Sequence, residues 1–171
     1  MRNIKITADS SANVFAMDGV AYANVPMKII TAKSEFVDTP DLNLEAMVDE
    51  IKVTKGKSGT SCPNIHDWLA AFGDADRIFA VTITSNLSGS FNAACIARDW
   101  YQEKHPGRRV FVIDSLSAGP ELTLIVEKLE QLIQYGINKE LMTSLDIDYT
   151  RNRLLEVLGL DDAEARTVSG E

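Results

Sequence analysis

The sequence predicts an α/β protein with a mainly parallel sheet and helices on both faces of that sheet. Short apolar runs rich in branched and aromatic residues, typical of buried strands, alternate with segments whose apolar residues recur at helical spacing. Hydroxyl-rich polar turns follow several of the apolar runs. With 171 residues, of which 45% are hydrophobic and 25% charged, the chain has the size of one globular domain with an appendage.

Five segments have the composition of strands, because they are short, apolar and bounded by charged or polar residues. They are 4–8, 25–30, 35–38, 78–83 and 109–113. Pro26 is tolerated only near the start of a strand or at an edge, since proline has no N–H to donate. The segment 35–38 is expected to be a short edge piece.

Helical spacing is found in four segments between and after these strands: 41–53, 63–72, 90–103 and 120–136. Pro63 and Pro120 suit first helical positions, with Ser61 or Cys62 near the cap of the second helix, and Gly136 is a stop signal. In the third helix, either Trp100 or Tyr101 is expected to point inward.

The chain is therefore divided into an α/β domain at 1–137 and a helical C-terminal extension with an acidic tail at 138–171. Short helices are expected at 138–145 and 149–160. The extension is expected to cover apolar surface of the domain.

Composition restricts the classes of function. Asp and Glu outnumber Lys and Arg by 25 to 17, giving a net charge of −8 and no basic cluster, so we expect no nucleic-acid partner and no anionic membrane surface. There is no run long enough for a signal peptide or a membrane span, which predicts a cytoplasmic protein. Cys62 and Cys95 lack metal and redox spacing, so neither a metal site nor a cofactor is expected.

The segment 83–94 contains the central candidate site, where a buried strand gives way to a hydroxyl-rich turn and then to a helix. The first turn of a helix leaves N–H groups without intrahelical partners, and Ser88 and Ser90 either cap them or help to hold an anion. Thr60 and Ser61 precede another helix in the same way. This arrangement suits a carboxylate or a phosphate.

Parallel strands bring their carboxyl ends to one edge of a sheet, where ligands of such folds bind. The turns at 9–11, 85–90 and 114–115 each follow a predicted strand. We therefore expect these three turns to lie along one edge.

Four segments together resemble the DegV family of fatty-acid-binding proteins, in matching order and approximate spacing. They are 9–11 (DSS), 59–63 (GTSCP), 85–94 (SNLSGSFNAA) and 112–115 (VIDS). The resemblance implies a bacterial α/β protein that binds a long-chain fatty acid, with the acyl chain in an apolar tunnel. It also implies a partner fatty acid kinase that phosphorylates the bound carboxylate to an acyl phosphate, so that the protein itself is a carrier and not an enzyme.

By position, the resemblance assigns Thr60 and Ser88 as contacts of the fatty-acid carboxylate, with Ser61 and Gly89 as close neighbours. Six further residues are expected near the ligand: Asp9, Ser10, Ser85, Ser90, Asp114 and Ser115. No catalytic residue is expected.

The family's second domain supplies an Arg and a His near the carboxyl group. No matching segment follows Gly136, so the family's C-terminal domain is expected to be absent from this sequence. Neither His66 nor His105 is assigned the role of the family histidine.

Two other classes of function stay open from the sequence. A small hydrolase or phosphate-handling enzyme would use Ser88 or Cys62 as nucleophile, with His66 as the nearby candidate base. A non-binding interaction module would use the serines and threonines only as helix caps. A homodimer is also left open.

Overall fold

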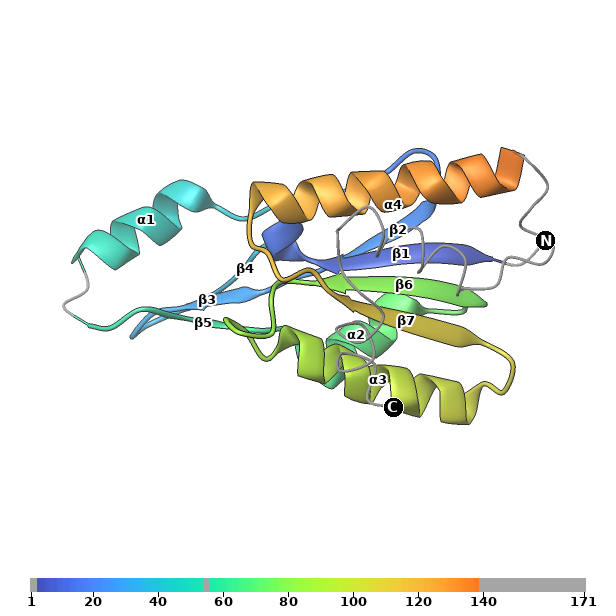
Figure 1. The fold of residues 1–171 in the computed structure, drawn as a ribbon. Helices are drawn as coiled ribbons and strands as arrows, with labels where there is room; N and C mark the ends of the chain where they lie inside the picture. Colours follow the sequence, from blue (N-terminus) through green and yellow to red (C-terminus); the bar gives the residue numbers. More distant parts are fainter. Residues whose placement is uncertain (1–2, 54–55, 139–171) are drawn as a thin grey trace.

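The computed structural model describes residues 3–53 and 56–138. Its main sheet has four parallel strands in the order β2-β1-β6-β7, as Figure 1 shows. These strands are β1 (Ile4–Asp9), β2 (Ala21–Val25), β6 (Arg77–Thr82) and β7 (Arg109–Asp114). The predicted parallel α/β sheet is confirmed, and its three central-strand predictions match β1, β6 and β7 to within one residue at each end.

Helices cover both faces of the main sheet, as predicted. Helix α4 (Pro120–Asn138) lies along one face, and α2 (Ile65–Phe72) and α3 (Ser90–Lys104) lie along the other (Figure 1). Strands buried on both faces are apolar along their whole length, which explains the continuous apolar runs in the sequence.

The two faces of the sheet have separate apolar cores. In β6, Phe79 and Val81 belong to the core under α4, whereas Ile78 and Ala80 belong to the core under α2 and α3. This alternation follows from the two-residue period of a strand. Removing a large side chain such as the fully buried Trp68 from water stabilises the fold by about 1.5–3 kcal/mol.

A single strand at 25–30 was a wrong prediction. The chain breaks at Pro26 into β2 and β3 (Lys28–Ile30), which belong to different sheets. Strand β3 pairs antiparallel with β4 (Glu35–Val37) and with β5 (Gly59–Ser61), in the order β4-β3-β5. The predicted edge strand at 35–38 is thus confirmed as β4, while residues 59–61, expected in a turn, form a strand.

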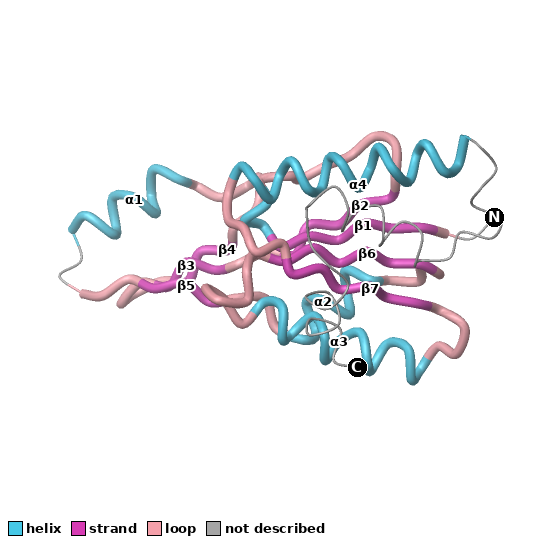
Figure 2. The backbone as a smooth tube through the Cα atoms, in the orientation of Figure 1, coloured by secondary structure: helices cyan, strands magenta, loops and turns pink. Residues whose placement is uncertain are grey.

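The small sheet and α1 (Leu44–Val53) project beyond the main sheet, as Figure 2 shows. The apolar residues of α1 share one face as predicted, but no residue of this helix is buried, and Leu44 is 62% exposed. Glu50 connects α1 to the β3–β4 turn by accepting hydrogen bonds from the hydroxyls of Thr31 and Ser34.

Some helix boundaries differ from the predictions. Asn64, rather than Ser61 or Cys62, caps α2, and it forms a capping box with Asp67, so Pro63 lies before the helix. Helix α4 continues through Gly136 to Asn138. Of the two aromatic residues expected as alternatives near the end of α3, Tyr101 is buried, whereas Trp100 is 42% exposed.

The expected helices at 138–145 and 149–160 and the acidic tail lie outside the described residues, apart from the end of α4. The predicted boundary between domain and extension therefore stays a prediction.

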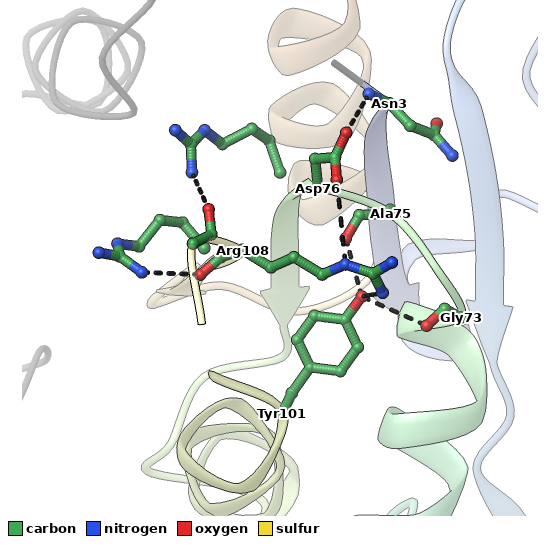
Figure 3. Close-up of polar contacts among 9 residues, drawn as sticks. Asn3, Gly73, Ala75, Asp76, Tyr101 and Arg108 are labelled. Atoms are coloured by element: carbon green, nitrogen blue, oxygen red, sulfur yellow. Dashed lines mark hydrogen bonds and ion pairs between the residues drawn. The ribbon is translucent and has the colours of Figure 1, made fainter. Parts of the chain in front are cut away.

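A polar cluster closes the amino end of the main sheet (Figure 3). The Tyr101 hydroxyl lies 2.8 Å from the Ala75 carbonyl oxygen, and Arg108 Nη1 donates to that hydroxyl at 2.9 Å. Asp76 accepts from the Asn3 N–H at 3.0 Å and lies 3.9 Å from Arg108 Nε. The cluster therefore joins the start of β1 to the ends of α2 and α3.

Candidate functional site

The turns after β1, β6 and β7 meet at the carboxyl end of the main sheet, as predicted. Asp9 Oδ2 accepts a hydrogen bond from the Ile83 N–H at 2.9 Å. Asp114 Oδ1 accepts one from the Ser85 N–H at 3.1 Å. Because β6 lies between β1 and β7, both of its neighbours contribute a carboxylate to the turn that follows it. Residues 9–11, 83–90 and 114–117 are called the rim below.

Residues 84–89, called the central turn below, are folded back on themselves. The Thr84 carbonyl oxygen accepts from the N–H groups of Leu87 and Ser88, and the Thr84 N–H donates to the Ser117 carbonyl oxygen at 3.0 Å. Thr84 is thus the inner anchor of the turn. The sequence analysis did not assign Thr84 or Ser117 a role, although Thr84 lies inside the polar stretch that drew attention to the turn.

Helix α3 begins at Ser90, with Gly89 at the N-cap position and no side-chain cap. The Ser90 N–H donates to Ser88 Oγ at 3.2 Å. The Ser90 hydroxyl instead donates to Asp9 Oδ2 at 2.6 Å. The expectation that Ser90 caps the helix was therefore wrong, since its side chain bonds to a neighbouring strand end.

Cys62, the residue after β5, lies close to Gly89 of the central turn. A Cβ atom built on Gly89 would lie 3.3 Å from Cys62 Sγ, which is a tight contact. Thr60, paired with Ile29 in the small sheet, is two residues away from Cys62. The structure thus brings the segments that carry Thr60 and Ser88 together, although they are far apart in the sequence. No sequence signal pointed to the contact between Cys62 and Gly89.

Exposure divides the ten predicted site residues into two groups. Thr60, Ser85 and Gly89 are exposed, and Ser61 and Ser88 are half-buried. The other five are buried: Asp9, Ser10, Ser90, Asp114 and Ser115. Only the first group can be reached by a ligand without rearrangement.

The buried hydroxyls take part in hydrogen bonds within the fold. Ser10 Oγ accepts from the Met27 N–H at 3.0 Å, which fixes the chain between β2 and β3. Ser115 Oγ donates to the Ser117 carbonyl oxygen and accepts from the Ser117 N–H, both at 3.1 Å. These contacts assign Ser10 and Ser115 to the support of the rim.

Asp9 is the most enclosed carboxylate of the rim. Burial raises the pKa of Asp9, and the hydrogen bonds from the Ser11 and Ser90 hydroxyls and from the Ile83 N–H oppose that rise. Burial also raises the pKa of Tyr22 on the neighbouring strand β2, with a further contribution from the charge of Asp9. The Tyr22 hydroxyl donates to the Val14 carbonyl oxygen at 2.8 Å.

The candidate base of the enzyme hypothesis, His66, packs against an aromatic ring. His66 is exposed, and its ring packs edge-on against Trp100 with centroids 6.3 Å apart. Within residues 3–53 and 56–138, no hydrogen bond connects the His66 ring to Cys62 or Ser88. The same residues contain no group of three or more His, Cys, Asp or Glu side chains placed to hold a metal ion. None of the helices described is both long and apolar enough for a membrane crossing.

Comparison with known protein families decides the assignment. Residues 3–161 match the family model described as "Uncharacterised protein, DegV family". The chain belongs to the DegV family. This result confirms the resemblance found in the sequence.

Curated DegV relatives are longer than this chain. A DegV domain-containing protein of Streptococcus gordonii is 39% identical over 163 residues, which cover 92% of this chain and 58% of the relative. A DegV domain-containing protein of Streptococcus pneumoniae has the same identity and coverage. The chain therefore spans 58% of the length of these relatives.

Solved structures of DegV proteins confirm the fold. A DegV family protein from Eubacterium eligens, loaded with heptadecanoic acid, is 37% identical, with a TM-score of 0.83 over 91% of this chain and 54% of that one. The Fatty Acid Kinase (Fak) B3 protein of Streptococcus pneumoniae, loaded with linoleic acid, is 36% identical, with a TM-score of 0.81 over 93% of this chain and 55% of that one.

Proposed function

We propose that this chain binds the carboxylate of a long-chain fatty acid between the Thr60 strand and the central turn. The observation that supports this proposal is the closeness of Cys62 Sγ to Gly89, because Thr60 and Ser88 belong to these two neighbouring segments and are not buried. DegV structures that are 36–37% identical to this chain contain fatty acids, which supports a fatty acid as the ligand.

The chemistry of the rim, together with that of the neighbouring strand β5, suits a carboxylate. Thr60 and Ser88 supply hydroxyl donors, with Ser61 and Gly89 beside them. The N-terminus of α3 adds N–H groups that lack intrahelical partners and the positive end of a helix dipole. Hydrogen bonds to a charged group contribute about 1.5–3 kcal/mol each, so two hydroxyls account for a strong preference for an ionised acid.

The acyl chain contributes affinity through burial, at about 0.8 kcal/mol per methylene removed from water. This chain spans 54–58% of its relatives' length. We therefore include the apolar surface that buries the acyl chain in the proposal. Binding of this kind needs no catalytic base.

We further propose that the bound carboxylate is presented to a fatty acid kinase, which converts it to an acyl phosphate. The similarity to the Fatty Acid Kinase (Fak) B3 protein supports this partner. A carboxylate held at an exposed turn is accessible to a phosphoryl donor, whereas a buried one is not.

Two measurements test the binding proposal. The chain purified from cells and extracted for mass spectrometry should release fatty acid, and the delipidated chain should bind linoleic acid more tightly than its methyl ester. Equal affinity for acid and ester would contradict a carboxylate site. Binding of neither, by a chain whose circular dichroism shows an intact fold, would contradict fatty-acid binding altogether.

A further inference from the structure

One oxygen atom of Asp9 closes both ends of the central turn. Oδ2 accepts from the Ile83 N–H, which precedes the turn, at 2.9 Å, and from the Ser90 hydroxyl, which follows it, at 2.6 Å. The other oxygen, Oδ1, accepts from the Ser11 hydroxyl. The side chain is fully buried, so these donors replace the water that an exposed carboxylate would have.

We propose that Asp9 is a positioning residue for fatty-acid binding, which holds the central turn in the shape that presents Ser88 and Gly89 to the ligand. This inference rests on the proposed function. Asp9 itself is buried and is not expected to touch the ligand. It acts through Ser90 and the backbone of Ile83.

A carboxylate is better suited to this task than an amide. An ionised carboxylate has only acceptor sites, and Asp9 uses both of its oxygens to accept. An asparagine at this position would have one acceptor oxygen and one NH₂ group. In one orientation that NH₂ group would face the Ile83 N–H, so that two donors oppose each other. In the other orientation the Ser11 hydroxyl would have to turn to accept from the NH₂ group, and an uncharged oxygen would replace the carboxylate as acceptor for Ile83 and Ser90, which weakens those bonds.

Because Asp9 is negatively charged, its repulsion of the ligand and its support of the turn predict opposite changes in fatty-acid affinity when the charge is removed. A negative side chain beneath an anion site weakens anion binding by direct repulsion, so removing that charge alone would tighten it. Loss of the turn's shape would weaken it instead. Replacing Asp9 by asparagine therefore separates the two effects, because the positioning role predicts weaker binding.

Asp114 holds the turn in a more limited way. Its Oδ1 accepts from the N–H groups of Ser85 and Leu116, so it anchors only the beginning of the turn. The end of the turn, next to Ser88 and Gly89, is fixed by the bond between Ser90 and Asp9. Asp9 is accordingly the residue on which the position of Ser88 depends more strongly.

The test compares Asp9→Asn with two other variants of the whole chain. Ser90→Ala removes a single hydrogen bond to Asp9 and keeps the carboxylate, and it serves if Asp9→Asn folds poorly. Asp76→Asn, at the opposite end of the sheet, is the matched control. Each variant is measured by calorimetry with linoleic acid and its methyl ester, and by hydrogen exchange of residues 84–90 without ligand.

Asp9→Asn is expected to bind linoleic acid roughly tenfold more weakly and the methyl ester within about twofold of the parent, with faster exchange in residues 84–90. Ser90→Ala should show the same pattern to a smaller degree. A variant that combines Asp9→Asn with Ser90→Ala should lose less binding free energy than the sum of the two single losses. Asp76→Asn should leave binding and exchange in these residues unchanged.

Unchanged or tighter acid binding by Asp9→Asn, or equal loss for acid and ester, would overturn the positioning role. Unchanged exchange in residues 84–90 of Ser90→Ala would overturn it as well. If the parent chain itself binds neither acid nor ester, the proposed function fails. The exchange experiment still decides, without ligand, whether Asp9 shapes the turn.

Discussion

The two ends of the main sheet use aspartates in opposite ways. At the amino end, the half-exposed Asp76 accepts from a backbone N–H and faces the guanidinium of Arg108 at 3.9 Å. At the carboxyl end, Asp9 and Asp114 are buried and accept hydrogen bonds from hydroxyls and backbone N–H groups.

The difference indicates which end is adapted to a ligand. The amino-end cluster satisfies its groups internally, since Tyr101, Arg108 and Asp76 contact one another and the backbone at Asn3, Gly73 and Ala75 (Figure 3). At the carboxyl end the buried carboxylates support a turn whose outer hydroxyls remain accessible. Substitutions at the amino end should therefore change stability, and those at the carboxyl end should change binding.

The largest effect is expected from the accessible hydroxyls. Thr60→Val and Ser88→Ala should each reduce the affinity for linoleic acid by about 1.5–3 kcal/mol, because each removes a hydrogen bond to a charged group. Calorimetry checks this, with the methyl ester as reference ligand. Wild-type affinity in both variants would remove the proposed distinction between the two ends.

Tyr101→Phe should have the next largest effect, on stability alone. It deletes a hydroxyl that lies between the Ala75 carbonyl and Arg108, so the free energy of unfolding should fall by about 1–2 kcal/mol. Urea denaturation measures the fall. A change in fatty-acid affinity of this variant would show that the amino end is coupled to the site.

Arg108→Gln should reduce stability by less than about 1 kcal/mol. The side chains of Arg108 and Asp76 are 28% and 43% exposed, so solvent and salt screen their attraction. Denaturation at low and at high salt should show the difference from the parent shrinking as salt is added. A loss larger than that of Tyr101→Phe would contradict this order of effects.

The smallest effect is expected in the pH dependence of stability. Burial raises the pKa of Asp9, so in the window above the ordinary Asp value the folded state binds more protons than the unfolded state. Stability from Asp9 is then present at low pH and lost as pH rises through the raised pKa. Tyr22, which faces Asp9 from β2, has a raised pKa and stays neutral throughout.

Asp9→Asn removes this titration. The free energy of unfolding of the parent, minus that of the variant, should therefore decrease as the pH rises above the ordinary Asp value and through the raised pKa. Denaturation curves at several pH values check the sign. An increase over this range would show that the folded state lowers the pKa of Asp9.

Three strands of the main sheet, β1, β6 and β7, were predictable because they are long enough to show a pattern and each ends in a polar turn, whereas β2 was missed apart from Val25. In the small sheet, β4 was predicted and β3 lies within the predicted strand 25–30, whereas β5 was missed, since its three residues are too few to show a period. The change from one sheet to the other at Pro26 could not be predicted either. Proline is compatible with a strand edge, and only the pairing of the two halves with different sheets distinguishes the alternatives.

The sequence predicted a set of hydroxyls and carboxylates near strand ends. It did not predict which of them are accessible and which are buried. Ser88 and Ser90 are two residues apart and chemically identical, yet Ser88 is half-buried at the turn and Ser90 is fully buried against Asp9. That difference depends on the position of β1 beside β6, which is set by the tertiary structure and not by the local sequence. The contact between Cys62 and Gly89 is of the same kind.

A crystal structure of this chain with heptadecanoic acid would test the central claim most directly. The account predicts density for the carboxylate between the two segments, with its oxygens at about 2.5–3.2 Å from the hydroxyls of Thr60 and Ser88. A carboxylate bound elsewhere, with these two hydroxyls facing solvent, would contradict it.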